Sequence, residues 1–227
     1  MSAIIAAFSD SNIIPSLFEG LEQVQSEYGE YDAVSIAALT AGRIQQSQFV
    51  KKEPVYPGQD FSSFLEKQSL TACLSLACLR HKKLEPKYHV HLSVTEEMAL
   101  AYHGLIDNLP DIREDLLQLG YELHSLCSSE LILRFIRRYL DIDFSVREAS
   151  LTAIRRLKGE FAIVALFADQ NSLIVAQRGV PMTLGIKGNE LYITSNNRAN
   201  IVQPTMHIEE DSLLILRSSQ KINQTFG

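Results

Sequence analysis

Two closely spaced histidines form the most metal-like pattern in this chain. His89 and His91 are separated by one residue, and on a β-strand that spacing puts both imidazoles on one face. A zinc ion held there would need further ligands from Cys, His, Asp or Glu. No nearby Asp, Glu or Cys in the sequence clearly completes such a shell, so we expect exposed histidines and no metal ion.

The cysteines are the other reactive side chains, and there are three of them: Cys73, Cys78 and Cys127. An odd number cannot pair completely. The apolar run at residues 3–8 lacks the basic flank of a secretory signal, so it predicts a buried strand. We therefore expect reduced thiols in a cytoplasmic protein. Because Cys73 and Cys78 lie in an apolar run, core packing is favoured over a metal or redox role.

Charge and composition argue against two classes of partner. The formal net charge is −6, whereas a nucleic-acid-binding protein needs a concentrated basic face. The two densest basic clusters have the spacing of solvated faces of amphipathic helices, and they are Arg134, Arg137 and Arg138, and Arg155, Arg156 and Lys158. No stretch approaches the ~20 apolar residues that span a bilayer. Neither a phosphate-binding Walker loop nor a glycine-rich dinucleotide motif is present, so we expect no cofactor.

The elements that must position these residues follow from the hydrophobic pattern. Strands are predicted at 3–8, 31–39, 43–50, 70–79, 98–106, 161–167, 172–177, 182–186, 191–194 and 212–216. Helices are predicted from Pro15 to Gly29 and at 61–67, 109–119, 128–139 and 145–158. The segment 80–97 is charged and should be largely exposed. Strands, then helices, then strands indicate one α+β domain with mostly antiparallel sheets over residues 1–217, followed by a polar tail at 218–227.

Short segments spread over nearly the whole chain follow one another in a recognisable order. They include Ser-Leu-Phe-Glu-Gly-Leu at 16–21, Tyr-Asp at 31–32, His-Val-His at 89–91, His-Gly-Leu-Ile-Asp-Asn at 103–108, Leu-Lys-Gly-Glu-Phe-Ala at 157–162, Arg-Gly-Val-Pro at 178–181 and Ser-Asn at 195–196. In this order they resemble the glutaminase domain of glucosamine-6-phosphate synthases, which are class II glutamine amidotransferases. The resemblance implies the N-terminal-nucleophile fold, a four-layer αββα sandwich.

The resemblance also implies where a catalytic site would lie. In that family an N-terminal cysteine attacks the side-chain amide of glutamine, and its own α-amine is the base, so the nucleophile must be the first residue. The matching residue here is Ser2, which needs removal of Met1 to act. The family's oxyanion hole, an asparagine side chain and the next glycine N–H, corresponds to His103 and Gly104. Losing one such donor typically costs ~2.7–4 kcal/mol in the barrier.

The groups that would grip the substrate are also replaced. The family's arginine for the glutamine carboxylate falls on Leu76 or Ala77, depending on register, and we take Ala77 as the position. Its aspartate for the substrate amine falls on Ser128. Each charged hydrogen bond is worth roughly 1.5–3 kcal/mol. These replacements predict a domain that is degenerate at the active site and does not hydrolyse glutamine.

Each of these positions also has a purely structural interpretation. Ser2 can be only the residue after the initiator, His103 a strand-end residue satisfied by its neighbours, and Ser128 the N-cap of the helix that begins there.

Three functions remain open from the sequence. The first is a non-catalytic domain that binds either a protein partner carrying a sugar-isomerase-type domain or a small molecule in the remodelled pocket. The second is an active amidohydrolase, in which Ser2 attacks an amide and His103 and Gly104 stabilise the oxyanion. The third is the glutaminase-like fragment of a longer sugar-phosphate aminotransferase. We take the first as the working hypothesis.

Overall fold

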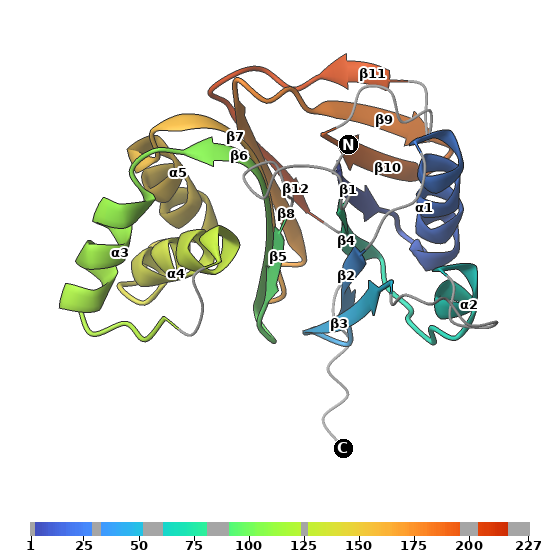
Figure 1. Ribbon diagram of the computed structural model, residues 1–227, viewed down its shortest axis with the longest axis horizontal. Coiled ribbons are helices and arrows are strands. Elements are labelled where there is room, and N and C mark those ends of the chain that lie inside the picture. Colours follow the sequence, from blue (N-terminus) through green and yellow to red (C-terminus); the bar gives the residue numbers. More distant parts are fainter. Residues whose placement is uncertain are drawn as a thin grey trace.

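The computed structural model describes residues 3–28, 33–51, 61–80, 91–123, 127–195 and 204–217. They form two antiparallel β-sheets stacked face to face, with helices on both outer faces (Figure 1). This is the four-layer αββα arrangement and the α+β class that the resemblance implied. The tail at 218–227 lies outside the described residues.

The larger sheet, sheet A, has seven strands in the order β11-β9-β10-β1-β4-β2-β3. Its strands are β1 (Ala3–Phe8), β2 (Ala33–Thr40), β3 (Arg43–Val50), β4 (Leu74–Arg80), β9 (Thr183–Lys187), β10 (Glu190–Thr194) and β11 (Pro204–His207). Its outer face is covered by α1 (Ile14–Tyr28) and α2 (Phe61–Glu66) (Figure 1). The central strands β1 and β4 pair antiparallel, with Ala3 opposite Leu79.

The smaller sheet, sheet B, has five strands in the order β12-β8-β7-β6-β5. They are β5 (His91–Val94), β6 (Met98–Ile106), β7 (Gly159–Phe167), β8 (Ser172–Arg178) and β12 (Leu213–Arg217). Three helices cover its outer face: α3 (Leu109–Gln118), α4 (Ser128–Leu140) and α5 (Val146–Arg156) (Figure 1).

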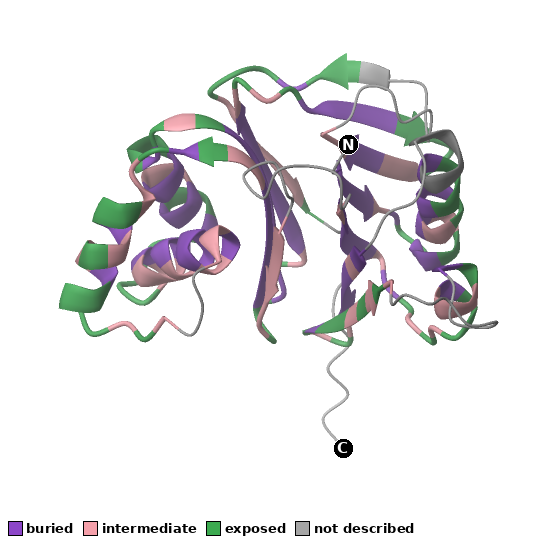
Figure 2. Ribbon diagram, viewed as in Figure 1, coloured by how far each residue is buried: buried purple, intermediate pink, exposed green. Residues whose placement is uncertain are grey.

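The side-chain period of two divides each central strand between two cores. In β6, Leu100 and Tyr102 pack toward the helices, whereas Ala99 and Ala101 pack into the layer between the sheets. A third core lies between sheet A and α1. Figure 2 shows the result: the central strands of both sheets are buried along most of their length, whereas the edge strands β3, β5 and β12 are mostly half-buried or exposed. Every site residue on these strands therefore faces either a helix layer or the inter-sheet layer.

Two helix starts show how local sequence fixes an element. Ser145 is the N-cap of α5, and it forms a reciprocal capping box with Glu148. Asn108 holds the N-cap position of α3, but its side chain makes no cap bond. Instead its Nδ2 donates to the Arg156 carbonyl at 2.8 Å and its Oδ1 accepts from the Lys158 N–H at 2.9 Å. Asn108 thus ties the end of β6 to the start of β7.

The sequence prediction failed at two short strands. The segment 80–97 was expected to be largely exposed, yet it contains β5, whose four residues are half-buried. β11 was not predicted either. Both are four-residue strands at the edge of a sheet, and so short a segment carries little apolar alternation.

Candidate functional site

Gly104 lies in β6 at a point where only glycine fits. Its φ is +121°, and a Cβ there would lie 2.2 Å from the Glu160 carbonyl oxygen and 2.8 Å from the Phe161 Cα. The Tyr102 hydroxyl donates a hydrogen bond of 2.5 Å to the Gly104 carbonyl. Burial raises the pKa of Tyr102 to about 12, so this donor stays protonated. The backbone at Gly104 is thereby held in a fixed orientation.

The matching glycine on the neighbouring strand is Gly159. Its φ is +119°, and a Cβ there would lie 2.3 Å from the Leu105 carbonyl oxygen. Gly159 pairs with Ile106, two positions beyond the pair of Gly104 and Phe161. The two glycines therefore let β6 and β7 approach closely at the end of the sheet. This close approach explains the glycine in each of the family-like segments 103–108 and 157–162.

A third family-like segment docks on this same end of the sheet. Arg178 donates from Nε to Asp211 at 2.5 Å and from a guanidinium NH to the Leu157 carbonyl at 2.7 Å. Its guanidinium also lies 5.2 Å from the centre of the Phe161 ring. Next to it, Gly179 has a φ of +68° and packs against the side chain of Glu160. The segments at 103–108, 157–162 and 178–181 thus meet in space.

His103 faces the layer between the two sheets. It pairs with Ala162, whose side chain belongs to the inter-sheet core. Its Nδ1 is buried and makes no hydrogen bond to the described residues. Burial lowers the pKa of His103 below its usual 6.5, so the ring is neutral at pH 7 and one ring nitrogen carries a proton. The expectation of a histidine satisfied by its neighbours is wrong for Nδ1.

Ser2 lies outside the described residues. β1 begins one residue later, and it is fixed at its start to the end of β10. The Ile4 N–H donates to the Ser195 hydroxyl at 3.0 Å, and the Ser195 N–H donates to the Ile4 carbonyl at 3.1 Å. Ser195 belongs to the family-like Ser-Asn segment, so this segment anchors the strand that follows the nucleophile position.

Ala77, which the sequence analysis took as the lost arginine position, lies on the outer face of β4. Ala77 is fully buried in the core between sheet A and α1, on the face of β4 that points away from the inter-sheet layer. Leu76, the other register weighed, is fully buried in the inter-sheet core that His103 faces. A strand side chain cannot reach the opposite face of its own sheet. Of the two registers, Leu76 is therefore the one whose side chain lies in the inter-sheet layer.

Ser128 does not cap its helix. The N-cap of α4 is Cys127, and Ser128 is the first helical residue. Ser129, by contrast, is fully buried, and its hydroxyl lies 2.8 Å from that of Ser93 and 3.0 Å from the sulfur of Cys127. The start of α4 thus presents an uncharged serine at the position of the family's acid, beside a thiol that the sequence analysis did not assign to a site.

The metal-like pair His89 and His91 is only half within the described residues. Among the residues that the structure describes, no group of three or more His, Cys, Asp or Glu could hold a metal ion. His89 lies outside that set, whereas His91 is the first residue of β5. None of Cys73, Cys78 and Cys127 forms a disulfide in the structure; Cys78 is buried in the inter-sheet core as predicted, whereas Cys73 is half-buried. No helix in the described ranges is long and apolar enough to cross a membrane.

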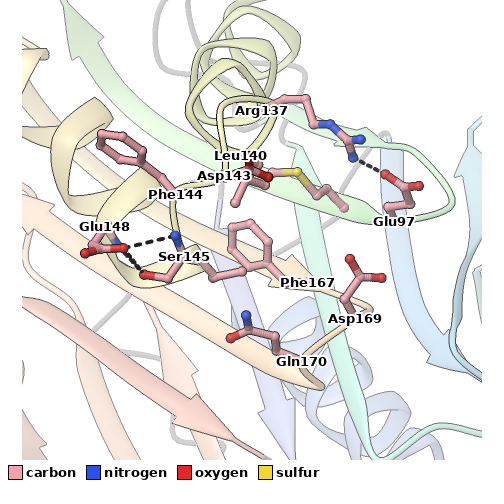
Figure 3. Close-up of a pocket in the computed structure, with 12 residues that line it drawn as sticks. Glu97, Arg137, Leu140, Asp143, Phe144, Ser145, Glu148, Phe167, Asp169 and Gln170 are labelled. Atoms are coloured by element: carbon pink, nitrogen blue, oxygen red, sulfur yellow. Dashed lines mark hydrogen bonds and ion pairs between the residues drawn. The ribbon is translucent and has the colours of Figure 1, made fainter.

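A pocket of 490 Å³ opens at the other end of sheet B (Figure 3). Its wall includes Met98 and Phe167, and Arg137 bridges to Glu97 at its rim. Met98 is five positions from His103 along β6, which is roughly 16 Å in a strand. The pocket is therefore separate from the positions aligned with the family's site. Nothing in the sequence analysis predicted it, because its lining comes from loops and helix ends far apart in the chain.

The fold and the convergence of these segments define a class of protein: an amidotransferase of the N-terminal-nucleophile type. A profile of the glutamine amidotransferase domain matches residues 87–201. The chain therefore belongs to the glutamine amidotransferase domain family. Among solved structures, glutamine phosphoribosylpyrophosphate amidotransferase from B. subtilis superposes with a TM-score of 0.73 at 16% identity, over 95% of this chain and 47% of that one. That likeness shows the fold.

The curated relatives define the subgroup. The chain is 28% identical over 221 residues to glutamine–fructose-6-phosphate aminotransferase [isomerizing] of Bartonella quintana, covering 95% of this chain and 35% of the relative. It is 28% identical over 228 residues to the enzyme of the same name from Pseudomonas aeruginosa, covering 96% of this chain and 36% of the relative. It is thus a class II glutamine amidotransferase domain related to these enzymes, and it spans about a third of their length.

Proposed function

We propose that this amidotransferase domain does not hydrolyse glutamine and acts as a binding or regulatory domain. The observation that carries the proposal is the burial of Leu76. At the position of the family's arginine, its side chain is fully enclosed in the inter-sheet core. Hydrocarbon there offers no charged hydrogen bond to a substrate carboxylate. Ser128, at the position of the family's acid, has no charge for the substrate ammonium.

The reacting groups point the same way. A hydroxyl at Ser2 is a weaker nucleophile than the thiol of the family's cysteine at neutral pH. At the oxyanion position, His103 is a neutral imidazole that donates from one nitrogen only. Two lost charge contacts at roughly 1.5–3 kcal/mol each, together with an altered oxyanion donor, leave little transition-state stabilisation for free glutamine.

The partner we propose is a protein with the sugar-isomerising activity. The relatives are named as isomerising aminotransferases and are about three times as long as the matched region. A domain that keeps the family's fold but has lost its catalytic residues can still bind other proteins through the surfaces of that fold. We therefore infer that this domain binds a sugar-isomerase-type domain, which is either part of the same polypeptide or a separate chain.

A glutaminase assay tests the first half of the proposal. The protein is first checked by intact mass for removal of Met1, since activity requires a free amine at Ser2. Ammonia release from glutamine should equal that of the S2A variant. A Ser2-dependent rate above that background would overturn the proposal and favour the active amidohydrolase.

Binding is measured separately. Thermal shift should show stabilisation by sugar phosphates or by a co-purifying sugar-isomerase-type domain, but none by glutamine or glutamate, because ligand binding raises apparent stability by mass action. Stabilisation by an isomerase-type domain supports the partner version. Stabilisation by glutamine alone would show that the domain still binds the carboxylate and ammonium groups of an amino acid, and it would contradict the role assigned to Leu76.

A further inference from the structure

Cys127, His91 and Ser129 form a cluster that the amidotransferase chemistry does not use. Cys127 is half-buried at the N-cap of α4, a 13-residue helix. His91, the first residue of the edge strand β5, makes a side-chain hydrogen bond to the Cys127 thiol. The Ser129 hydroxyl lies 3.0 Å from the same sulfur. An imidazole and a hydroxyl thus converge on the sulfur of one half-buried cysteine.

The direction of the hydroxyl bonds follows from counting protons. Ser129 has one hydroxyl proton and is also 2.8 Å from the Ser93 hydroxyl. If Cys127 is a thiolate it can only accept, so Ser129 donates to the sulfur and Ser93 donates to Ser129. Ser129 is fully buried, and this relay satisfies its hydroxyl without water. The arrangement therefore suits a charged sulfur.

The helix adds a second source of stabilisation. The N-terminus of a helix carries unpaired N–H groups and a partial positive charge, which favour an anion at the N-cap. Cysteines at helix N-termini or beside histidine are the ones that ionise readily. Burial alone would raise the pKa of Cys127, but hydrogen bonds from His91 and Ser129 and the nearby His91 charge lower it to about 6.

Within the described part of the chain, titratable groups from two strands interact with this sulfur. From β5 comes His91, and from β4 the buried Cys78, whose pKa is raised by burial and by the neighbouring Cys127. On α4 itself, Glu130 lies in the first turn. Because Cys78 resists ionisation, it is a poor nucleophile toward a disulfide formed at Cys127.

We propose that Cys127, held by His91 and Ser129 at the start of α4, is an exchange-reactive thiol that forms mixed disulfides with small disulfide molecules. The Cys127 sulfur attacks one sulfur of the disulfide. A new S–S bond forms, the original S–S bond breaks, and the other half leaves as a thiolate, so the incoming disulfide is the oxidant. The product carries a new group next to Ser128, at the start of α4.

Reaction of the full chain with oxidised glutathione, followed by intact mass, tests this site. Wild-type protein should gain one glutathione in a fast phase, and the C127S variant should lose that phase. C73S is the matched control, because Cys73 is also half-buried and outside any disulfide, and its pKa is raised by burial; C73S should keep the fast phase. Survival of the fast phase in C127S, or an internal disulfide in place of the glutathione adduct, would overturn the proposal.

The pH profile separates reactivity from mere accessibility. The fast rate in wild type should rise with a midpoint near pH 6. In H91N the midpoint should move toward the 9.0 of an ordinary thiol, and the rate at pH 6 should fall roughly tenfold, after allowing for the higher intrinsic reactivity of a more basic thiolate. An unshifted midpoint in a folded H91N protein, verified by its circular dichroism melt, would contradict the role of His91.

Discussion

At the residue scale, Gly104 shows how the site depends on a missing side chain. A Cβ at Gly104 would overlap the Glu160 carbonyl at 2.2 Å in a backbone region that other residues rarely adopt. We expect Gly104→Ala to lower the free energy of unfolding by roughly 3 kcal/mol or more, from backbone strain and forced displacement of β7. Urea denaturation measures the loss.

The matched control for this substitution is Gly120→Ala. Gly120 also has a positive φ, +82°, but a Cβ there would meet nothing within 4 Å. Gly120→Ala should therefore lower the free energy of unfolding only by the strain of a left-handed backbone, ~1–2 kcal/mol. Equal losses in the two variants would show that φ alone, and not the close approach of β6 to β7, demands glycine at Gly104.

His103 makes stability depend on pH with a sign that can be worked out. Burial lowers its folded-state pKa below 6.5, so the unfolded chain binds the proton more tightly. The free energy of unfolding should therefore fall as the pH drops below about 6.5. His103→Asn removes the titrating group and should flatten this part of the profile, measured by urea denaturation from pH 8 to 5. His207→Asn, on an exposed edge-strand residue, should keep the wild-type slope; an unchanged slope in His103→Asn would refute the assignment.

At the element scale, the two helix starts of the α-layer make a direct comparison. Ser145→Ala removes the N-cap of α5 and its capping box with Glu148, and should cost ~1 kcal/mol. Ser128→Ala lies one position inside α4, whose N-cap is Cys127, and should change stability by less than ~0.5 kcal/mol. Thermal melts of both variants decide; a larger loss in Ser128→Ala would restore it as a capping residue.

Sequence periodicity predicted the bounds of helices and strands better than it predicted which face of a sheet each side chain lies on. The bounds of β3 and β6 were predicted at 43–50 and 98–106, as the structure has them, because turn residues flank them. The face of β4 was not predictable, since all residues from Leu74 to Leu79 are buried and a strand buried on both sides shows no alternation. The choice between Leu76 and Ala77 needed the sheet order, which no local pattern contains.

The cluster at Cys127 shows the same limit. Its members come from β5, which the sequence did not predict, and from the start of α4. His91 was noticed as one half of a metal-like pair, but its partner in space is a thiol 36 positions away in the sequence. Only the pairing of β5 with β6 and the packing of α4 on sheet B bring them together.

At the scale of the whole molecule, the inter-sheet layer is the part of the fold on which the proposed loss of glutamine hydrolysis depends. It is a continuous apolar core to which β1, β4, β6 and β7 all contribute, and Leu76 lies inside it with no exposed surface. Restoring the family's cation by Leu76→Arg should therefore not restore glutamine binding. An uncompensated buried charge typically costs 3–5 kcal/mol, so the variant should unfold at a markedly lower urea concentration.

Leu76→Met is the size-matched control for that experiment, because a volume-conserving apolar exchange costs less than ~1.5 kcal/mol. Comparing Leu76→Arg with Leu76→Met also shows whether the space beside His103 is filled by the apolar core or open to a ligand. If Leu76→Arg folded with the stability of Leu76→Met and gained a thermal shift with glutamate, the arginine would have found solvent and a carboxylate in reach. The space beside His103 would then be an amino-acid pocket that lacks one residue, and the proposed loss of glutamine hydrolysis would rest on Ser2, His103 and Ser128.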